Sequence, residues 1–402
     1  MRPVYLDNNA TTRTDPLVVE AMLPFFSEHF GNASSTHAFG AHVGEAVKAA
    51  RKQLQALLGA AFDHEIIFTS GGTEADSAAI LSALETQEGR DEIVTTTVEH
   101  PAILTLVAHL EKTRGTRVHL IGVDRHGRLD LDAYGKALSP RTAIASVMWA
   151  NNETGTLFPV AELAEMARQA GALFHTDAVQ AVGKVPIDLK STAIDMLSLS
   201  GHKLHGPKGI GALYVKKGVK FRPLIRGGHQ ERGRRGGTEN VPGVIGLGAA
   251  ADLALKHMEA ERTHVKALRD RLEQGILQQV SHALLNGDGD NRLPNTANIA
   301  FEYLDGEAVL HNLNKAGIAA STGSACTSGS TEPSHVLRAM NLPASALHGA
   351  IRLSLSRENT GEDVDRVLDV LPEIITRLRA MSPAWLAHEG AGQQGEGVAG
   401  HV

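Results

Sequence analysis

The sequence predicts an α/β fold in which a large domain with a mostly parallel sheet is followed by a smaller α+β domain. Short β-branched runs alternate with helix-like segments through the first 260 residues, a pattern typical of a parallel sheet covered on both faces. A helical pattern rich in Ala, Leu, Glu and Arg then spans residues 249–280, long enough to bridge two domains. A second region of strands and helices follows this connector.

The expected strands of the large domain are short and apolar. They are EIIFTS (65–70), EIVTTTV (92–98), AIASVMWA (143–150), ALFHTD (172–177), DMLSLS (195–200) and IGALYV (210–215). Helix-like segments lie between several of them, such as AELAEMARQAG (161–171), whose final glycine suits a helix C-cap. In the second region we expect strands in NTANIAFEYL (295–304) and AIRLSLS (350–356), and a final amphipathic helix around residues 362–381.

These patterns predict the organisation of the chain. We expect a segment that packs with the small domain (1–15), the large domain (16–260), the small domain (261–387) and a tail (388–402). The tail is rich in Gly and Gln and has little to bury, so it is expected to be disordered.

Composition narrows the class of protein. The chain has 402 residues, 42% of them hydrophobic, and a formal net charge of -6 without dense blocks of like charge. This balance argues against a nucleic-acid or membrane surface and favours a small ligand. No run approaches the ~18 apolar residues of a membrane span, and the first residues lack the apolar core of a signal peptide, so we expect a cytoplasmic protein. One cysteine, Cys326, excludes an internal disulfide framework.

Polar residues and glycines follow the expected strands. Ligands of parallel sheets bind beyond the carboxyl ends of the strands, so we expect these residues to form the site. In GGTE (71–74), glycines at a strand-to-helix turn expose backbone N–H groups at a helix N-terminus, and Thr73 adds a hydroxyl, which suits a phosphate. Taken alone, the same motif is better explained as a tight turn with an N-cap.

A carboxylate and an amine follow two further strands. Asp177 ends an apolar strand, where a buried carboxylate needs a cationic partner: a protonated pyridine nitrogen, or else an arginine or a helix cap. Gln180 lies near enough to face the same ligand. Lys203 stands among glycines in SLSGHKLHGPKG, and a desolvated lysine there becomes a usable nucleophile. An anion cradle, a carboxylate and an amine are the groups that bind pyridoxal phosphate (PLP).

Four other residues are candidates with open alternatives. His100 can stack on a cofactor ring and move protons, or act as a structural hydrogen-bonder. Asn152 either faces the site or stabilises the NNETG turn. Cys326 lies in STGSACTSGS, a segment of small residues that suits an exposed nucleophile. Arg352 can clamp a carboxylate or form a salt bridge between domains.

At this point the motifs resemble a known family, the PLP-dependent cysteine desulfurases of fold type I, which share the fold of aspartate aminotransferase. The resemblance is to the NifS/IscS branch and is strongest to its NifS type. The matching motifs, in order, are YLDNNATT, FGNASSTH, FTSGGTEADSAAI, VEHPAI, SVMWANNETGT, FHTDAVQAVGKVPID, LSLSGHKLHGPKG, RGGHQERGRRGGTEN, LPNTANIAFEY, GSACTSGSTEPSHV and HGAIRLSLSR. They cover essentially everything before the tail. One departure is HNLNKAG (311–317), where apolar residues are expected before NKAG.

The resemblance implies roles for the candidate residues. Lys203 would carry the cofactor, Asp177 would pair with its ring nitrogen, Gln180 would bind its ring hydroxyl, and His100 would stack on the ring. Asn152 would position ring and substrate, and Arg352 would bind the substrate carboxylate. The residues implied at the phosphate are Gly72, Thr73, Ser200, Gly201 and His202, with Thr238 from the second subunit of a homodimer.

The resemblance also implies the reaction. L-cysteine would yield L-alanine and a persulfide on Cys326, with His100 as the acceptor of the thiol proton. The sulfur would pass to an iron–sulfur scaffold or another acceptor protein, with nitrogenase clusters as the destination, and Cys326 is a candidate shared ligand of a cluster. The alternatives are a selenocysteine lyase, an aminotransferase on the same fold, and a non-catalytic scaffold subunit.

Overall fold

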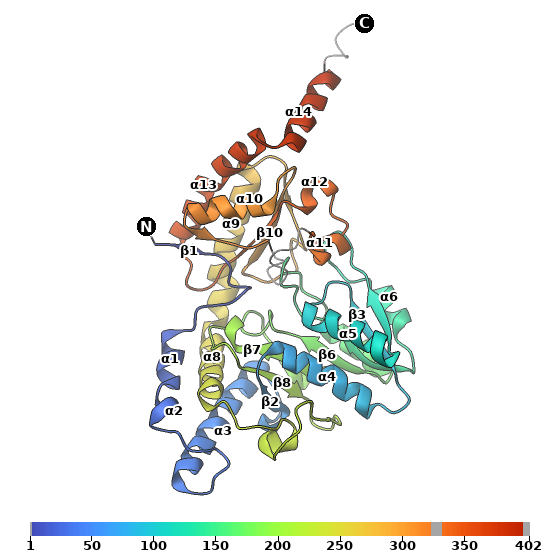
Figure 1. Cartoon of the computed structure of the whole chain (residues 1–402), viewed down its shortest axis with the longest axis vertical. Coiled ribbons are helices and arrows are strands. Elements are labelled where there is room, and N and C mark those ends of the chain that lie inside the picture. Colours follow the sequence, from blue (N-terminus) through green and yellow to red (C-terminus); the bar gives the residue numbers. More distant parts are fainter. Residues whose placement is uncertain (1, 323–331, 397–402) are drawn as a thin grey trace.

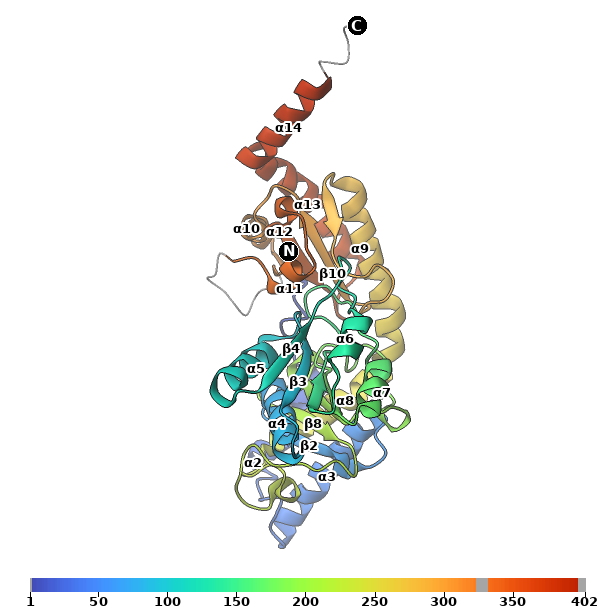
Figure 2. The same cartoon turned by 90° about the vertical axis from the view of Figure 1, so that its right-hand side faces the viewer.

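The computed structural model describes residues 2–322 and 332–396, with side chains up to residue 390. Two domains follow one another along the long axis of the molecule, as Figure 1 shows with the large domain below and the small domain above. A long helical connector runs alongside both (Figures 1 and 2). The predicted α/β fold with a large and a small domain is confirmed.

A seven-stranded mixed sheet forms the centre of the large domain, in the order β2-β8-β7-β6-β5-β3-β4. Its strands are β2 (Ile66–Thr69), β3 (Glu92–Thr96), β4 (Arg117–Ile121), β5 (Thr142–Ser146), β6 (Leu173–Asp177), β7 (Met196–Ser200) and β8 (Gly211–Val215). Strands β3 to β7 pair in parallel, and β8 runs antiparallel to both of its neighbours. The carboxyl ends of the parallel strands therefore meet at one edge, which is where a ligand site is expected.

Helices cover both faces of this sheet. They are α1 (Pro16–Met22), α2 (Pro24–Ser27), α3 (Ala38–Leu58), α4 (Gly72–Thr86), α5 (Pro101–Arg114), α6 (Leu131–Ala137), α7 (Val160–Gln169) and α8 (Val241–Ala260). Along β2, Ile66 and Phe68 pack into one apolar core and Ile67 into another, because successive side chains of a strand point to opposite faces. Both faces of the large sheet are thus buried, as the sequence pattern predicts.

The small domain is built on a three-stranded antiparallel sheet in the order β12-β10-β9. Its strands and helices are β9 (Ala283–Leu285), β10 (Thr296–Phe301), β12 (Ala350–Ser354), α9 (Lys266–Gln279), α10 (Gly306–Lys315), α11 (His335–Ala339), α12 (Ala344–Leu347) and α13 (Gly361–Ala380). Strand β1 (Val4–Tyr5) pairs with β11 (Ile318–Ala319), and Val4 and Leu6 pack into the core of this domain. The N-terminal segment therefore lies on the small domain before it enters the large one.

The connector between the domains contains a π-helical turn. Helix α8 continues through residues Glu261–Val265, which form π-helix, into α9. π-turns inside α-helices are frequent at functional sites. Here the turn places the buried carboxyl group of Glu261 at the junction of the two domains.

The sequence predictions differ from the structure at strands β1, β4, β9 and β11 and at the C-terminal tail. Strand β4 was not predicted, because it lies at the edge of the sheet and leaves Leu120 about half exposed. The prediction of a disordered tail is wrong for residues 388–396, because these residues lie in helix α14 (Pro383–Glu396). His388 stacks on Tyr303 with ring centroids 4.6 Å apart, a contact that the composition of the tail does not reveal. Residues 397–402 lie outside the described part. Within that part, every helix is too short or too polar to cross a membrane.

Candidate active site

A cavity of about 370 Å³ opens at the carboxyl ends of the parallel strands. Its volume is within the usual range for small-molecule sites. It brings together candidates from five strand ends and from the small domain. The predicted residues that line it are Gly72, Thr73, His100, Asn152, Asp177, Gln180, Ser200, His202, Lys203 and Arg352.

Three predicted residues do not line this cavity. Gly201 lies just behind it, where an added Cβ would come within 2.9 Å of the Pro207 carbonyl oxygen, so the turn before Lys203 requires glycine. Thr238 lines a separate cavity of about 210 Å³ together with Ser70 and Gly209. Cys326, as nucleophile and as candidate iron–sulfur ligand, lies outside the described residues.

One end of the cavity suits an anion. Helix α4 begins at Gly72, directly after β2, and its N-terminal N–H groups carry the positive end of the helix dipole. An added Cβ at Gly72 would lie 2.9 Å from Val179 Cγ2, so only glycine allows this close approach. Thr73, Ser200 and Lys208 line the same depression. Burial, followed by the charges of neighbouring lysines, lowers the pKa of His202 to about 4, so this imidazole is neutral and hydrogen-bonds Thr11 Oγ1 at 3.1 Å.

Another part of the cavity lining presents a buried carboxyl group. Asp177 ends β6 and accepts a hydrogen bond from the Val179 N–H at 2.9 Å. Burial raises its pKa, whereas His100 and Lys203 lower it. Gln180 donates through Nε2 to the Asn9 carbonyl at 2.9 Å, and its buried Oε1 has no partner among the described residues. A bound group at this point would supply the partner that Gln180 Oε1 lacks.

The N-terminal segment holds the catalytic lysine candidate, a contact that sequence reasoning missed. Lys203 Nζ donates to the carbonyl oxygens of Asn9, at 2.5 Å, and Ala10, at 2.8 Å. The Asn9 side chain bridges to the small domain through Thr296 Oγ1 at 2.8 Å. YLDNNATT is the only local signal for this role, since the partners are about 190 residues apart in sequence.

His100 caps the helix that follows β3. It is the N-cap of α5, and its Nδ1 accepts the backbone N–H of Ala102 at 3.1 Å. Burial lowers the pKa of His100, Lys203 and His335 lower it further, and Asp177 opposes them. The neighbouring Glu99 is fully buried, and burial raises its pKa to about 8.

A second buried carboxyl group, Asp76, also lines the cavity and was not predicted. Its Oδ1 lies 3.6 Å from His175 Nε2 and has no hydrogen-bond partner among the described residues. Burial lowers the pKa of His175 to about 3, so this pair is not an ion pair. Burial and then Asp177 raise the pKa of Asp76 well above its usual range. These influences favour the protonated form of Asp76, whereas His100 and Lys203 favour the charged form of Asp177.

Arg352 reaches the cavity from β12 of the small domain. It is 2% exposed, and it donates through Nη1 to the Asn152 carbonyl at 3.0 Å and through Nη2 to Asp7 Oδ1 at 2.7 Å. Its Nε has no partner among the described residues. Arg352 thus joins the three segments around the cavity and retains donors for an incoming carboxylate.

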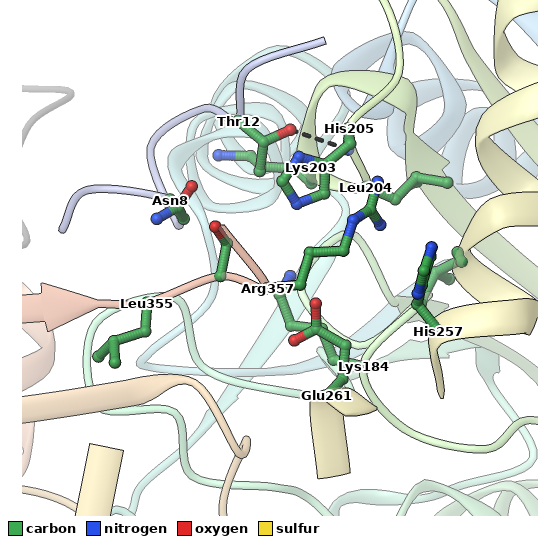
Figure 3. A pocket seen from close by; sticks show the side chains of 14 residues that line it. Asn8, Thr12, Lys184, Lys203, Leu204, His205, His257, Glu261, Leu355 and Arg357 are labelled. Atoms are coloured by element: carbon green, nitrogen blue, oxygen red, sulfur yellow. Dashed lines mark hydrogen bonds between the residues drawn. The ribbon is translucent and has the colours of Figure 1, made fainter. Parts of the chain in front are cut away.

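A smaller polar cavity of about 20 Å³, room for one water, lies behind Lys203 (Figure 3). Lys184 and Glu261, both buried, line it together with Arg357. Lys184 Nζ donates to the carbonyl of Gln180 at 3.1 Å. Burial lowers the pKa of Lys184 to about 8, and the charge of Glu261 partly offsets this effect. These groups connect the domain junction to the loop that carries Gln180.

Comparisons with known proteins identify the family. The class-V aminotransferase model matches residues 4–367. A cysteine desulfurase of Gluconacetobacter diazotrophicus is 73% identical over 96% of both chains, and the cysteine desulfurase NifS of Azotobacter vinelandii is 63% identical over the same shares. The chain belongs to the NifS-like cysteine desulfurases of the class-V aminotransferase family. A solved NifS-like protein is 37% identical, covers 94% of this chain and all of its own length, and superposes with a TM-score of 0.87.

The cavity fits the cofactor of this family, PLP. The cofactor carries a phosphate, a ring hydroxyl and a basic ring nitrogen, and the cavity offers the α4 N-terminus, the unpartnered Gln180 Oε1 and the buried Asp177. Gln180 Oε1 is thus a buried atom without a partner among the described residues that the ring hydroxyl of the cofactor would satisfy. Among the described residues there is no group of three or more His, Cys, Asp or Glu side chains that could hold a metal ion.

Proposed function

We propose that this protein is a PLP-dependent cysteine desulfurase that converts L-cysteine to L-alanine and leaves the sulfur as a persulfide on Cys326. The observation that carries the proposal is the convergence of an anion cradle, a buried carboxyl group, a lysine and an arginine on one cavity. The 73% identity to a cysteine desulfurase supports the choice of reaction.

The chain's own residues perform distinct tasks. Gly72, Thr73, Ser200 and His202 would hold the phosphate, and Asp177 would keep a proton on the ring nitrogen. When bound, PLP stabilises negative charge at the α-carbon of an amino acid. Lys203 would hold the cofactor covalently, and its Nζ would accept the α-proton of the substrate. Asn152 and Arg352 orient the substrate, the latter through its carboxylate.

The sulfur step balances without an outside oxidant. Cys326 Sγ attacks the sulfur of the substrate, the Cβ–S bond breaks, and Cβ takes a proton to become the methyl group of alanine. The sulfur is oxidised to the persulfide level while the carbon is reduced. A thiol of pKa ~8.5 is mostly protonated at neutral pH, so the reaction needs conditions that favour the thiolate of Cys326.

The active unit is proposed to be a homodimer in which Thr238 contributes to the phosphate site of the partner. Its position outside the main cavity of its own chain supports this assignment. The persulfide is passed to an acceptor protein such as an iron–sulfur scaffold. The resemblance to NifS favours nitrogenase clusters as the destination.

The test is incubation with L-cysteine and a thiol reductant, with alanine and sulfide both measured. Equal yields are expected. Transfer of the amino group to a keto acid without sulfide would establish an aminotransferase instead. Absence of any turnover in the PLP-loaded protein would favour a scaffold subunit. A strong preference for L-selenocysteine in competition would indicate a selenocysteine lyase.

A further inference from the structure

His100 is held in one tautomer by the helix that it caps. A backbone N–H can only donate, so the 3.1 Å contact from Ala102 requires an unprotonated Nδ1 on His100. In a neutral imidazole the proton is then on Nε2. The tautomer therefore follows from the positions of Ala102 N and His100 Nδ1, because the backbone N–H of Ala102 cannot act as an acceptor.

Protonation of this imidazole is opposed from several sides. A proton on Nδ1 would remove the cap and place two donors face to face. The N-terminus of α5, a helix of 14 residues, carries the positive end of its dipole at the same point. Lys203 and His335 add positive charge nearby, and Asp177 is the opposing negative group. Burial acts in the same direction as the cations and is the largest influence on the pKa of His100.

We propose that His100 takes part in the reaction as a neutral hydrogen-bond donor through Nε2–H, and not as the base that accepts the proton of the Cys326 thiol. Its Nδ1 is committed to α5, so a hydrogen bond that His100 donates to a group in the cavity that it lines is made through Nε2. This replaces the role of proton acceptor that the sequence suggested. The inference rests on the proposed function for its chemistry, whereas the tautomer rests on the cap alone.

Two substitutions separate the two nitrogens. In His100→Asn the amide oxygen can take the place of Nδ1, since asparagine is a favoured N-cap, but the distal donor is lost. In His100→Gln the longer side chain brings an amide N–H near the position of Nε2 and gives up the cap. We expect the asparagine variant to keep the melting temperature and lose about 10²–10³-fold in alanine formation. The glutamine variant should melt lower and retain at least about ten times the rate of the asparagine variant.

The chain provides a matched control. His37 caps α3 in the same way, with its Nδ1 accepting the Gly40 N–H at 3.2 Å, and it does not line the cavity. His37→Asn should leave both the melting temperature and alanine formation close to those of the parent. It shows that exchanging a histidine cap for asparagine is harmless where no reaction depends on the side chain.

A direct measurement does not require turnover. In the ¹⁵N-histidine-labelled holoenzyme at neutral pH, the signal that disappears in His100→Asn should show an unprotonated Nδ1 and a protonated Nε2. A protonated Nδ1 at neutral pH, or an asparagine variant as active as the glutamine one, would overturn the proposal. If the wild type shows the expected tautomer but makes no alanine, the tautomer stands and the proposed function fails.

Discussion

Replacing Arg352 by lysine tests how the substrate carboxylate is held. Two N–H groups of Arg352 donate to Asn152 and Asp7, and its Nε has no partner in the described part of the chain. Lysine keeps the charge but cannot make the two-point contact of a guanidinium with a carboxylate. A hydrogen bond to a charged group is worth about 1.5–3 kcal/mol, so loss of one should raise KM about 10- to 150-fold.

Asp7→Asn is the matched control, because it removes the ion partner and keeps the guanidinium. Arg352 and Asp7 are 2% and 21% exposed at their side chains. Breaking a fully buried pair costs about 3–5 kcal/mol, so for this partly exposed pair we expect a loss of about 2–3 kcal/mol in the free energy of unfolding. KM should stay the same or fall, since Asp7 no longer competes for Arg352.

Steady-state alanine formation and urea unfolding measure the two effects separately. The reasoning predicts that Arg352→Lys changes KM far more than it changes kcat, and that Asp7→Asn changes stability without raising KM. An unchanged KM in Arg352→Lys, together with a raised KM in Asp7→Asn, would refute it. Arg352 would then be a structural link between the domains.

Three further predictions concern the cofactor, the dimer and the domain junction. Borohydride reduction should fix PLP to Lys203 in the wild type and leave Lys203→Ala and Lys203→Arg unlabelled, because a guanidinium cannot form the imine; label on Lys208 would contradict the assignment. Co-expressed Lys203→Ala and Thr238→Ala chains should form heterodimers that recover activity in one of their two sites, whereas isolated heterodimers without activity would argue against a shared site. Burial lowers the pKa of Lys184 from 10.5 to about 8, so the unfolded chain binds more protons between these values, and the free energy of unfolding of the wild type should rise with pH across that window. Lys184→Met should lack this rise in urea titrations, and an equal slope in both proteins would show that Lys184 does not titrate there.

The fold and much of the cavity lining were predictable because both depend on local patterns. Alternating strands and helices predict a parallel sheet, and ligands of such a sheet bind at the carboxyl ends of its strands. Asp177 and Lys203 follow neighbouring strands β6 and β7, so their convergence follows from topology alone. Arg352 was harder to place, because its approach depends on how the small domain sits over the sheet.

The missed residues depend on contacts between distant segments. Nothing near Asn9 in the sequence indicates that its carbonyl oxygen accepts a hydrogen bond from Lys203. Lys184 and Glu261 line the same small cavity only because the end of α8 packs near the loop that follows β6. Asp76 lies in helix α4, and its sequence neighbours do not indicate that this acidic side chain is buried. The capping role of His100 had one local signal: Pro101 favours the first turn of a helix, which makes the preceding residue its N-cap.

The proposed reaction is tested most directly at Cys326, the one cysteine of the chain. In single turnover with L-cysteine, the wild type should form alanine and gain one sulfur on Cys326, detected by mass spectrometry of the intact protein and its peptides. Cys326→Ala should bind cofactor and substrate and change its visible spectrum, yet form alanine slower by about three powers of ten or more, equivalent to at least about 4 kcal/mol. Alanine formation by Cys326→Ala at near the wild-type rate, or a wild type without persulfide after turnover, would contradict the account.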